Sequence, residues 1–181
     1  MQLLEMHNLM IEQLHAEQVG TLLPELVALL RDAVDSGASI GFLPPLGVAE
    51  ADAYWRDVAA AIQSRTRILL AARDEQGIAG SVQVDLAQKP NASHRAEIVK
   101  LLVHRRARRQ GLGRALLTEA ESAAHAAGRS LLVLDTRRGD VAEQLYRGQG
   151  YIEAGSIPHY VRNADGDLED TVIFYRLLAP V

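Results

Sequence analysis

The 181-residue sequence contains no cysteine, which excludes disulfides, cysteine-ligated metals and thiol nucleophiles from its chemistry. Aromatic residues are scarce, at 4% of the chain, and no apolar run approaches the roughly 20 residues of a membrane-spanning helix. The formal net charge is −4, whereas broad nucleic-acid binding needs a basic surface. We therefore expect no nucleic-acid and no membrane partner. The acidic start of the chain does not resemble a signal peptide, so the expected location is cytoplasmic.

The residues that are present have the composition of an ordinary folded protein. Hydrophobic residues make up 48% of the chain and charged residues 23%. A chain of this length is large enough for a complete hydrophobic core. Because it contains no internal repeat, low-complexity tract or linker, we expect residues 1–181 to form a single domain.

The hydrophobic pattern of the first half predicts helices followed by a hairpin. Apolar residues recur at helical spacing over 22–34 and 48–63, and a weak pattern near the N-terminus indicates a strand over 6–13. A short apolar run at 66–72, a turn, and alternating apolar residues at 78–86 are typical of an antiparallel hairpin.

Strands and helices alternate in the second half. They are a strand at 95–103, a helix at 111–127, a strand at 131–134 ending in Asp135, a helix at 141–149 capped by Asp140, and strands at 151–157 and 171–177. This order predicts a mixed α/β sandwich built around one central βαβ unit.

The stretch from His104 to Arg114 is the strongest candidate for a binding site. It contains five arginines and two glycines between a predicted strand and a predicted helix. The first N–H groups of a helix have no internal acceptor, and the helix dipole adds partial positive charge there. Glycine lets a ligand approach the backbone closely. The stretch therefore favours binding of a phosphate group, although a solvated helix start is the more common role of surface charge.

Two familiar phosphate-binding motifs fit this stretch poorly. A P-loop needs a lysine followed by serine or threonine after its last glycine, and that sequence is absent. A dinucleotide-binding fingerprint needs a third glycine where this chain has Leu116, and its leading strand would not follow two helices and a hairpin.

The residues Arg108-x-x-Gly111-x-Gly113 resemble the Arg/Gln-x-x-Gly-x-Gly/Ala signature of the GNAT family, the Gcn5-related N-acetyltransferases. The flanking strands and helix, and the ending Ala142-x-x-Leu145-Tyr146-x-x-x-Gly150-Tyr151, follow the family's order, so the resemblance covers about residues 66–155. It implies a single acetyltransferase domain with a GNAT-like α/β fold. Its central sheet would be mixed, mostly antiparallel and six- to seven-stranded, with a splayed parallel pair and helices on both faces.

The resemblance also implies acetyl-CoA as the cosubstrate. Because the histidines lack metal-ligand spacing, we expect no metal. Backbone N–H groups of the turn would hold the pyrophosphate, and arginine side chains would contact the outer phosphates. Main-chain groups of Leu101, Leu102 and Val103 would pair with the pantetheine arm as an added strand, provided that the strands ending at Val103 and Asp135 separate. The implied cofactor-binding residues of the turn are Arg108, Arg109, Gln110, Gly111, Leu112, Gly113 and Arg114.

Glu97 and Asp135 are candidates for the catalytic base. Both would face the gap between the diverging strands, and a carboxylate buried there is unfavourable unless it is paired or functional. Two nearby acids raise the pKa of one above its reference of about 4, which makes it a better base for an ammonium substrate. In histone-acetylating relatives, a glutamate in the context of Ala96-Glu97-Ile98-Val99 is the general base. The ordinary alternatives are a solvent-facing Glu97 and an Asp135 that caps a turn.

Tyr146 is the third catalytic candidate, because a tyrosine at this place in the family lies near the thioester sulfur and is called the general acid. A tyrosine pKa of about 10 exceeds a thiol pKa of about 8.5, so full proton transfer would run uphill by roughly 2 kcal/mol. We therefore expect a hydrogen bond to the departing sulfur. The alternative is a tyrosine that only fills the core.

Further segments resemble the tabtoxin-resistance acetyltransferases of the family, which modify a β-lactam amino acid; they include residues 36–42, 88–91 and 134–136. We expect acetyl transfer to the primary amine of a small polar substrate, such as an amino-acid-like toxin or antibiotic, by direct attack in a ternary complex. Acetylation of proteins or peptides and a non-catalytic acetyl-CoA-binding module are the alternatives. The terminal strands could also form a homodimer.

Overall fold

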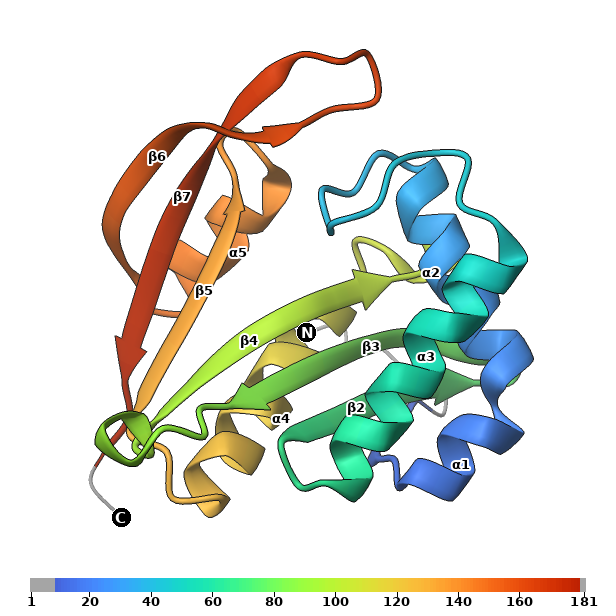
Figure 1. The fold of residues 1–181 in the computed structure, drawn as a ribbon, viewed down its shortest axis with the longest axis horizontal. Coiled ribbons are helices and arrows are strands. Elements are labelled where there is room, and N and C mark those ends of the chain that lie inside the picture. Colours follow the sequence, from blue (N-terminus) through green and yellow to red (C-terminus); the bar gives the residue numbers. More distant parts are fainter. Residues whose placement is uncertain (1–8, 180–181) are drawn as a thin grey trace, which may run out of the picture.

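The computed structural model describes residues 9–179 (Figure 1). The strands are β1 (Met10–Gln13), β2 (Arg67–Asp74), β3 (Gly77–Leu86), β4 (Arg95–Val103), β5 (Leu131–Arg137), β6 (Ile152–Arg162) and β7 (Leu168–Leu177). The helices are α1 (Ala16–Thr21), α2 (Leu23–Asp35), α3 (Val48–Gln63), α4 (Leu112–Ala126) and α5 (Val141–Gly148). No helix within this described part is long and apolar enough to span a membrane.

The strands form one seven-stranded sheet in the order β1-β2-β3-β4-β5-β7-β6. Every neighbouring pair is antiparallel except β4 and β5, which are parallel. This arrangement confirms the expected mixed sheet with one parallel pair. Some details differ from the expectation. α1 was not predicted, because its six residues are too few to show a helical period, and the last three strands are longer than expected: β5 continues to Arg137, β6 continues to Arg162 and β7 begins at Leu168. Residues 6–8 of the expected first strand lie outside the described residues.

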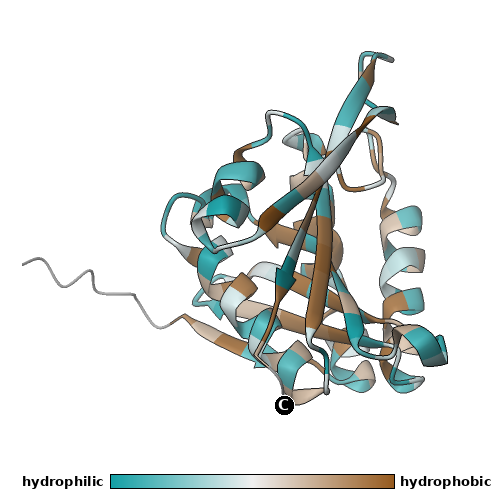
Figure 2. Ribbon diagram, turned by 90° about the vertical axis from the view of Figure 1, so that its left-hand side faces the viewer, coloured by the Kyte–Doolittle hydropathy of each residue, from teal (hydrophilic) through white to brown (hydrophobic). Residues whose placement is uncertain are grey.

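Helices cover both faces of the sheet, and each face has its own hydrophobic core. On β2, Leu69 and Ala71 belong to the core beneath α1, α2 and α3, whereas Leu70 and Ala72 belong to the core beneath α4 and α5. This alternation is the two-residue period of a strand. The strands in the middle of the sheet are accordingly hydrophobic along much of their length (Figure 2).

A β-bulge interrupts β4 at Lys100. Ser81 of β3 pairs with Leu102, and Gln83 pairs with Val99, so two residues of β4 oppose one residue of β3 between these pairs. Lys100 has φ = 51°, in the left-handed region that residues with a side chain rarely adopt. Such bulges bend a strand and redirect its side chains.

The extra residue changes which face the following side chains occupy. Ile98, before the bulge, packs in the core beneath α4, whereas Leu102, after it, packs in the core beneath α1, α2 and α3. Without the bulge, two residues separated by four positions would lie on the same face.

β4 and β5 are paired only at their beginnings. The parallel pairs are Arg95 with Leu131, Ala96 with Leu132, and Glu97 with Val133. Beyond them the two strands diverge, as Figure 1 shows, while β5 remains paired with β7 along its whole length. The edge of β4 that faces β5 therefore has no strand partner after Glu97, which confirms the expected splayed pair.

β6 is the outer strand of the sheet and is irregular. Its register with β7 shifts twice, between Glu153 and Gly155 and between Ile157 and Val161. His159, within the second shift, has φ = 55°. The tip of the β6–β7 hairpin extends toward the loop between α2 and α3 (Figure 1).

Gly80 allows α4 to pack closely against the sheet. A Cβ atom there would lie 2.8 Å from the carbonyl oxygen of Leu102 and 2.9 Å from Cδ1 of Leu116. We expect Gly80→Ala to lower the free energy of unfolding by about 1–3 kcal/mol, measured by denaturant unfolding. Gly20→Ala is the matched control, because a helical Cβ at Gly20 has no atom within 4 Å, and it should be neutral or stabilising. Equal stability of Gly80→Ala and the unaltered protein would contradict the close approach.

Candidate active site

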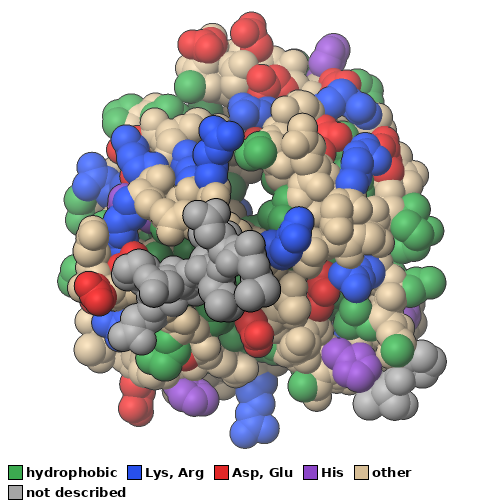
Figure 3. All heavy atoms as spheres, turned by 180° about the vertical axis from the view of Figure 1, so that it is seen from behind, with side chains coloured by type: hydrophobic (Ala, Val, Ile, Leu, Met, Phe, Trp, Pro, Cys, Tyr) green, Lys and Arg blue, Asp and Glu red, His purple; other side chains and the backbone are tan. Residues whose placement is uncertain are grey.

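The divergence of β4 and β5 opens a cleft of about 320 Å³. The charged and aromatic residues that line it are Glu97, Lys100, Asp135, Arg137, Asp140, Tyr146 and Tyr160. The cleft continues into a groove of about 560 Å³ between the loop at 36–44 and the tip of the β6–β7 hairpin. Seen from behind, the molecule has an opening with Lys and Arg side chains at its rim (Figure 3).

Glu97 and Asp135 lie on the two strands that bound the cleft. Glu97 pairs with Val133, two residues before Asp135, so the strand period places both carboxyl groups on the same face of the sheet. Both residues are exposed, which corrects the expectation that they would be buried. The reason is that the strands separate beyond Glu97, so that solvent reaches this part of the cleft.

The pKa of Glu97 is raised above its ordinary value. The largest cause is partial desolvation, because protein atoms surround one side of the carboxyl group although the residue as a whole is exposed. The negative charges of Asp135 and Asp85 raise the pKa further, while Arg95 and Lys100 lower it. A carboxylate with a raised pKa accepts a proton more readily, so Glu97 is better suited to act as a general base than an ordinary glutamate.

A row of polar contacts supports the sheet beside Glu97. Asp85 of β3 is the cross-strand partner of both Glu97 and Arg67, and Arg67 donates two hydrogen bonds to its carboxylate, at 2.8 and 2.5 Å. The buried Gln83 accepts a hydrogen bond from Arg67 at 3.0 Å and donates one to the Tyr54 hydroxyl at 2.8 Å. Sequence reasoning missed this row because its members come from separate elements.

Asp135 is held in place by a threonine of β7. The hydroxyl oxygen of the buried Thr171 lies 2.8 Å from Oδ2 of Asp135 and 2.9 Å from the carbonyl oxygen of Thr136. Its single proton can be donated to one of these oxygens at a time. This contact fixes the orientation of the Asp135 carboxylate at the cleft.

Tyr146 lines the cleft from α5 and is 6% exposed. Asp140 caps α5 as expected, accepting a hydrogen bond from the N–H of Ala142 at 3.0 Å. Burial raises the pKa of Tyr146, and the negative charges of Asp140 and Asp135 raise it further. A phenol with a raised pKa is a weaker proton donor, which favours a hydrogen-bonding role over full proton transfer.

Lys100 is a cleft residue to which the sequence assigned no role. It is the one charged residue in the apolar run from Ile98 to Val103, and this was the signal available from the sequence. In the structure it is half-buried, with Nζ 5.9 Å from the centre of the Phe42 ring. Its pKa is lowered by desolvation and then by Arg67.

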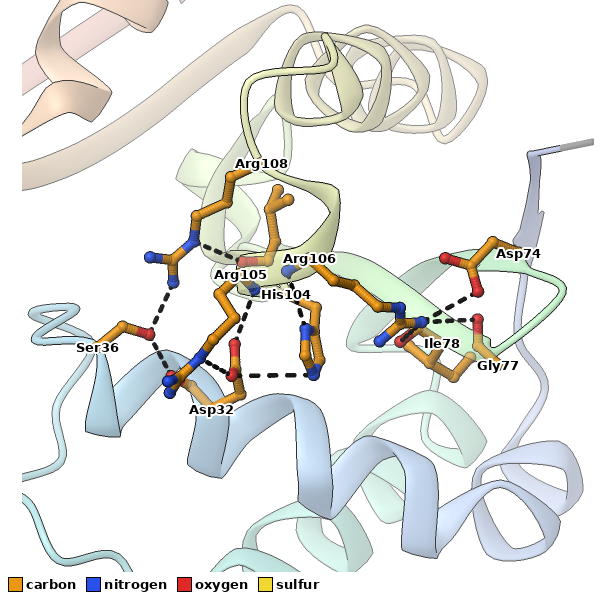
Figure 4. Close-up of polar contacts among 10 residues, drawn as sticks. Asp32, Ser36, Asp74, Gly77, Ile78, His104, Arg105, Arg106 and Arg108 are labelled. Atoms are coloured by element: carbon orange, nitrogen blue, oxygen red, sulfur yellow. Dashed lines mark hydrogen bonds and ion pairs between the residues drawn. The ribbon is translucent and has the colours of Figure 1, made fainter. Parts of the chain in front are cut away.

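Two arginines of the turn between β4 and α4 bind acidic residues of other elements (Figure 4). Arg105 binds Asp32 of α2 through both its backbone N–H and its guanidinium group. Arg106 donates hydrogen bonds to Oδ1 of Asp74 at 3.0 Å and to the carbonyl oxygen of Ile78 at 3.1 Å. These two side chains therefore serve the fold rather than a ligand.

Arg108 is exposed, and its guanidinium group forms hydrogen bonds within the protein rather than extending freely into solvent. Its Nε donates to the carbonyl oxygen of Val103 at 3.0 Å, and its Nη2 donates to Oγ of Ser36 at 2.8 Å (Figure 4). Arg109 and Arg114 have exposed side chains, and neither forms an ion pair within residues 9–179. Their charges are therefore available to a ligand.

The remaining residues of the expected cofactor set divide between surface and core. Leu102 and Leu112 are buried, Leu101 and Val103 are half-buried, and Gln110 is exposed. The buried leucines hold β4 and α4 in place, so only their backbone groups could reach a ligand.

The start of α4 has the properties of an anion site. Gly111 adopts φ = 83°, and no side chain caps the helix. The first internal hydrogen bond is donated by Ala115 to Gly111, so the N–H groups of Leu112, Gly113 and Arg114 have no partner within the helix. The first turn contains no acidic residue. These donors and the helix dipole fit a pyrophosphate group.

A comparison with known families now identifies the chain. Residues 34–151, more than half of its length, match the sequence profile of the Acetyltransferase (GNAT) family. The protein belongs to the GNAT family. Members of this family are acetyltransferases that bind acetyl-CoA, so the anion site at α4 lies in a protein whose relatives bind a pyrophosphate-containing cosubstrate.

Solved structures with the GNAT fold resemble the whole chain. The GNAT-family acetyltransferase from Streptococcus pneumoniae is 23% identical, with a TM-score of 0.76, covering 94% of this chain and 100% of that one. The ribosomal-protein-alanine N-acetyltransferase from Brucella melitensis is 21% identical, with a TM-score of 0.76 and coverages of 93% and 99%. YncA from Salmonella typhimurium, solved with its cofactor acetyl-CoA, is 18% identical, with a TM-score of 0.75 and coverages of 96% and 96%.

Substitution of Arg106 and of Arg109 distinguishes an arginine that stabilises the fold from one whose side chain is available to a ligand. Arg106→Met removes the hydrogen bonds to Asp74 and Ile78 and should lower the free energy of unfolding by about 1–3 kcal/mol. Arg109→Met should change stability by less than about 0.5 kcal/mol, because the side chain is exposed, but should weaken acetyl-CoA binding. Thermal unfolding and titration calorimetry measure the two effects. A large loss of stability in Arg109→Met would show that the assignment is reversed.

Proposed function

We propose that this protein transfers the acetyl group of acetyl-CoA to the primary amine of a small polar acceptor. The observation that carries the proposal is the cleft between β4 and β5, which has a candidate anion-binding site at one end and a candidate base at the other. An anion-binding helix start follows the end of β4, and Glu97, a carboxyl group with a raised pKa, lies where the strands begin to part. An acetyltransferase needs both a cosubstrate site and a base.

The binding residues for acetyl-CoA follow from the free hydrogen-bonding groups of the chain. We assign its pyrophosphate to the N–H groups at the start of α4, with the charges of Arg109 and Arg114 beside them. The unpaired edge of β4 at Leu101–Val103 offers main-chain groups to the pantetheine arm. The Val103 carbonyl retains this ability, since Arg108 occupies only one of its two lone pairs.

When bound, acetyl-CoA supplies a thioester, whose acetyl carbon bonds to the acceptor nitrogen as its bond to sulfur breaks. In our assignment Glu97 accepts the proton of the acceptor ammonium, directly or through a water, and Asp135 helps to keep the pKa of Glu97 raised. Main-chain N–H groups near Leu102 and Val103 stabilise negative charge on the carbonyl oxygen. Tyr146 donates a hydrogen bond to the departing sulfur.

The dimensions of the site favour a small acceptor. The groove leading to the cleft has a volume of about 560 Å³ and is bounded by the loop at 36–44 and the β6–β7 hairpin. This volume suits a molecule of amino-acid or antibiotic size. The resemblance to tabtoxin-resistance acetyltransferases supports an amino-acid-like toxin or antibiotic. The Brucella relative is named for a ribosomal protein, so peptide acetylation is the second candidate and belongs in the same assays.

The pyrophosphate assignment is tested by Gly113→Glu. A Cβ at Gly113 would make ordinary contacts, 3.5 Å from Leu145 and 3.7 Å from Val103, so the fold should tolerate a side chain there. The added carboxylate would lie at the anion site and should abolish acetyl-CoA binding in titration calorimetry. Ser122→Glu, which adds the same charge at an exposed position farther along α4, is the control and should bind normally. Normal affinity in Gly113→Glu would refute the site.

The base assignment is tested by Glu97→Gln and by the pH dependence of kcat/KM. Glu97→Gln should reduce kcat at least about a hundredfold and leave acetyl-CoA affinity unchanged. In the unaltered protein, kcat/KM should rise with pH as Glu97 loses its proton. Asp135→Asn removes a charge that raises the pKa of Glu97, so it should move this rise to lower pH. Full turnover in Glu97→Gln would remove Glu97 as the base.

A further inference from the structure

One cation of the cleft has no role in the transfer proposed above. Lys100 lies at the bulge of β4, where its left-handed φ of 51° and its half-buried side chain mark an unusual position for a charged residue. Its ammonium group lies beside the Phe42 ring, at 5.9 Å from the ring centre, and 3.5 Å from the place of a Cβ at Gly41. The loop after α2 thus covers one side of this ammonium group.

The two cations that line the cleft differ in their partners. Arg137 is already neutralised, because its guanidinium group lies 3.2 Å from Glu169 and 3.5 Å from Asp140. Lys100 forms no ion pair within 4.0 Å in the described part of the chain. The carboxylates of Asp135, Glu97 and Asp85 act on Lys100 electrostatically, but without direct contact they only partly offset the desolvation of its half-buried ammonium group. Direct contact with an anionic group of the acceptor would complete this compensation.

A purely electrostatic role for Lys100 within the protein explains less. Its positive charge lowers the pKa of Glu97, whereas the proposed base works better with a raised pKa. Tuning of the base by Lys100 would thus oppose the reaction. Binding of an acceptor anion would neutralise Lys100 and remove this opposition.

We propose that Lys100 binds the carboxylate of an amino-acid-like acceptor whose amine faces Glu97 and Asp135. This inference rests on the proposed function and narrows its substrate class. Lys100 is three residues after Glu97, so their Cα atoms are at most about 10 Å apart, and the flexible lysine side chain can reach across that span. Acids on both bounding strands and one unpaired cation match a zwitterion better than a simple amine or a diamine.

The test compares amino acids with the amines formed by removing their carboxylate. Suitable pairs are L-lysine with 1,5-diaminopentane, L-ornithine with 1,4-diaminobutane, and L-alanine with ethylamine, each assayed by CoA release. The unaltered protein should prefer the amino acid of a pair. Lys100→Met should raise KM for that amino acid about tenfold or more with little change in kcat, and should leave the decarboxylated amine within about twofold. Lys100→Arg should retain most of the preference.

The controls separate this inference from the proposed function. Lys89 is the only other lysine of the chain and is exposed outside the cleft, so Lys89→Met should behave like the unaltered protein. Lys100→Met should keep a thermal unfolding midpoint close to that of the unaltered protein, because the loss of a half-buried charge offsets the loss of its distant attraction to Asp135, Glu97 and Asp85. Absence of CoA release with every amine and peptide would refute the proposed function itself.

Two results would overturn the Lys100 assignment alone. One is an equal effect of Lys100→Met on both members of a pair, or a change confined to kcat and its pH profile, which would place Lys100 with the base. The other is an acetyl group on Lys100 in the intact mass of the protein after incubation with acetyl-CoA alone, since this would make the lysine an acceptor rather than an anion subsite.

Discussion

The separation of β4 from β5 is the constraint on which the rest of the molecule depends. A sheet can open in its middle only if each strand at the opening is held from its other side. β3 holds β4 and β7 holds β5 along their lengths, so three parallel residue pairs are enough to join the two parts of the sheet. The hydrogen-bonding groups left along β4 are then free to bind a ligand, and the helix that follows begins with free donors of its own.

The bulge of β4 affects both the packing of the strand and the side chains that line the cleft. It transfers Leu102 to the core beneath the first three helices, which anchors the end of β4, and it directs Lys100 into the cleft rather than into either core. A single inserted residue thus allows one strand to contribute the proposed base, a cation and an unpaired edge within a few positions. The turn that follows is fixed by Arg105, Arg106 and Arg108, so the anion site is held before a ligand arrives.

Local sequence patterns predict the parts of this protein that depend on local interactions. α3 and β4 have the expected bounds, because the helical spacing of apolar residues determines the first and an apolar run broken only by Lys100 determines the second. The Arg-Gly turn was also recognisable, since its residues are contiguous. The contacts of Asp85 with Arg67 and of Asp135 with Thr171 were not, because they join residues far apart in the sequence. The charge of Lys100 was visible in its apolar run, but only the bulge shows where it points.

The irregular outer strand also determines how the sheet can meet other molecules. An exposed edge presents backbone groups to which a further strand can add, and this is the usual route to fibrils. In β6 the regular row of backbone hydrogen-bonding groups is interrupted, because Pro158 has no N–H group and His159 adopts a left-handed backbone conformation. A neighbouring chain therefore finds no continuous ladder to extend, even though Ile152, Ile157 and Tyr160 remain exposed along the strand.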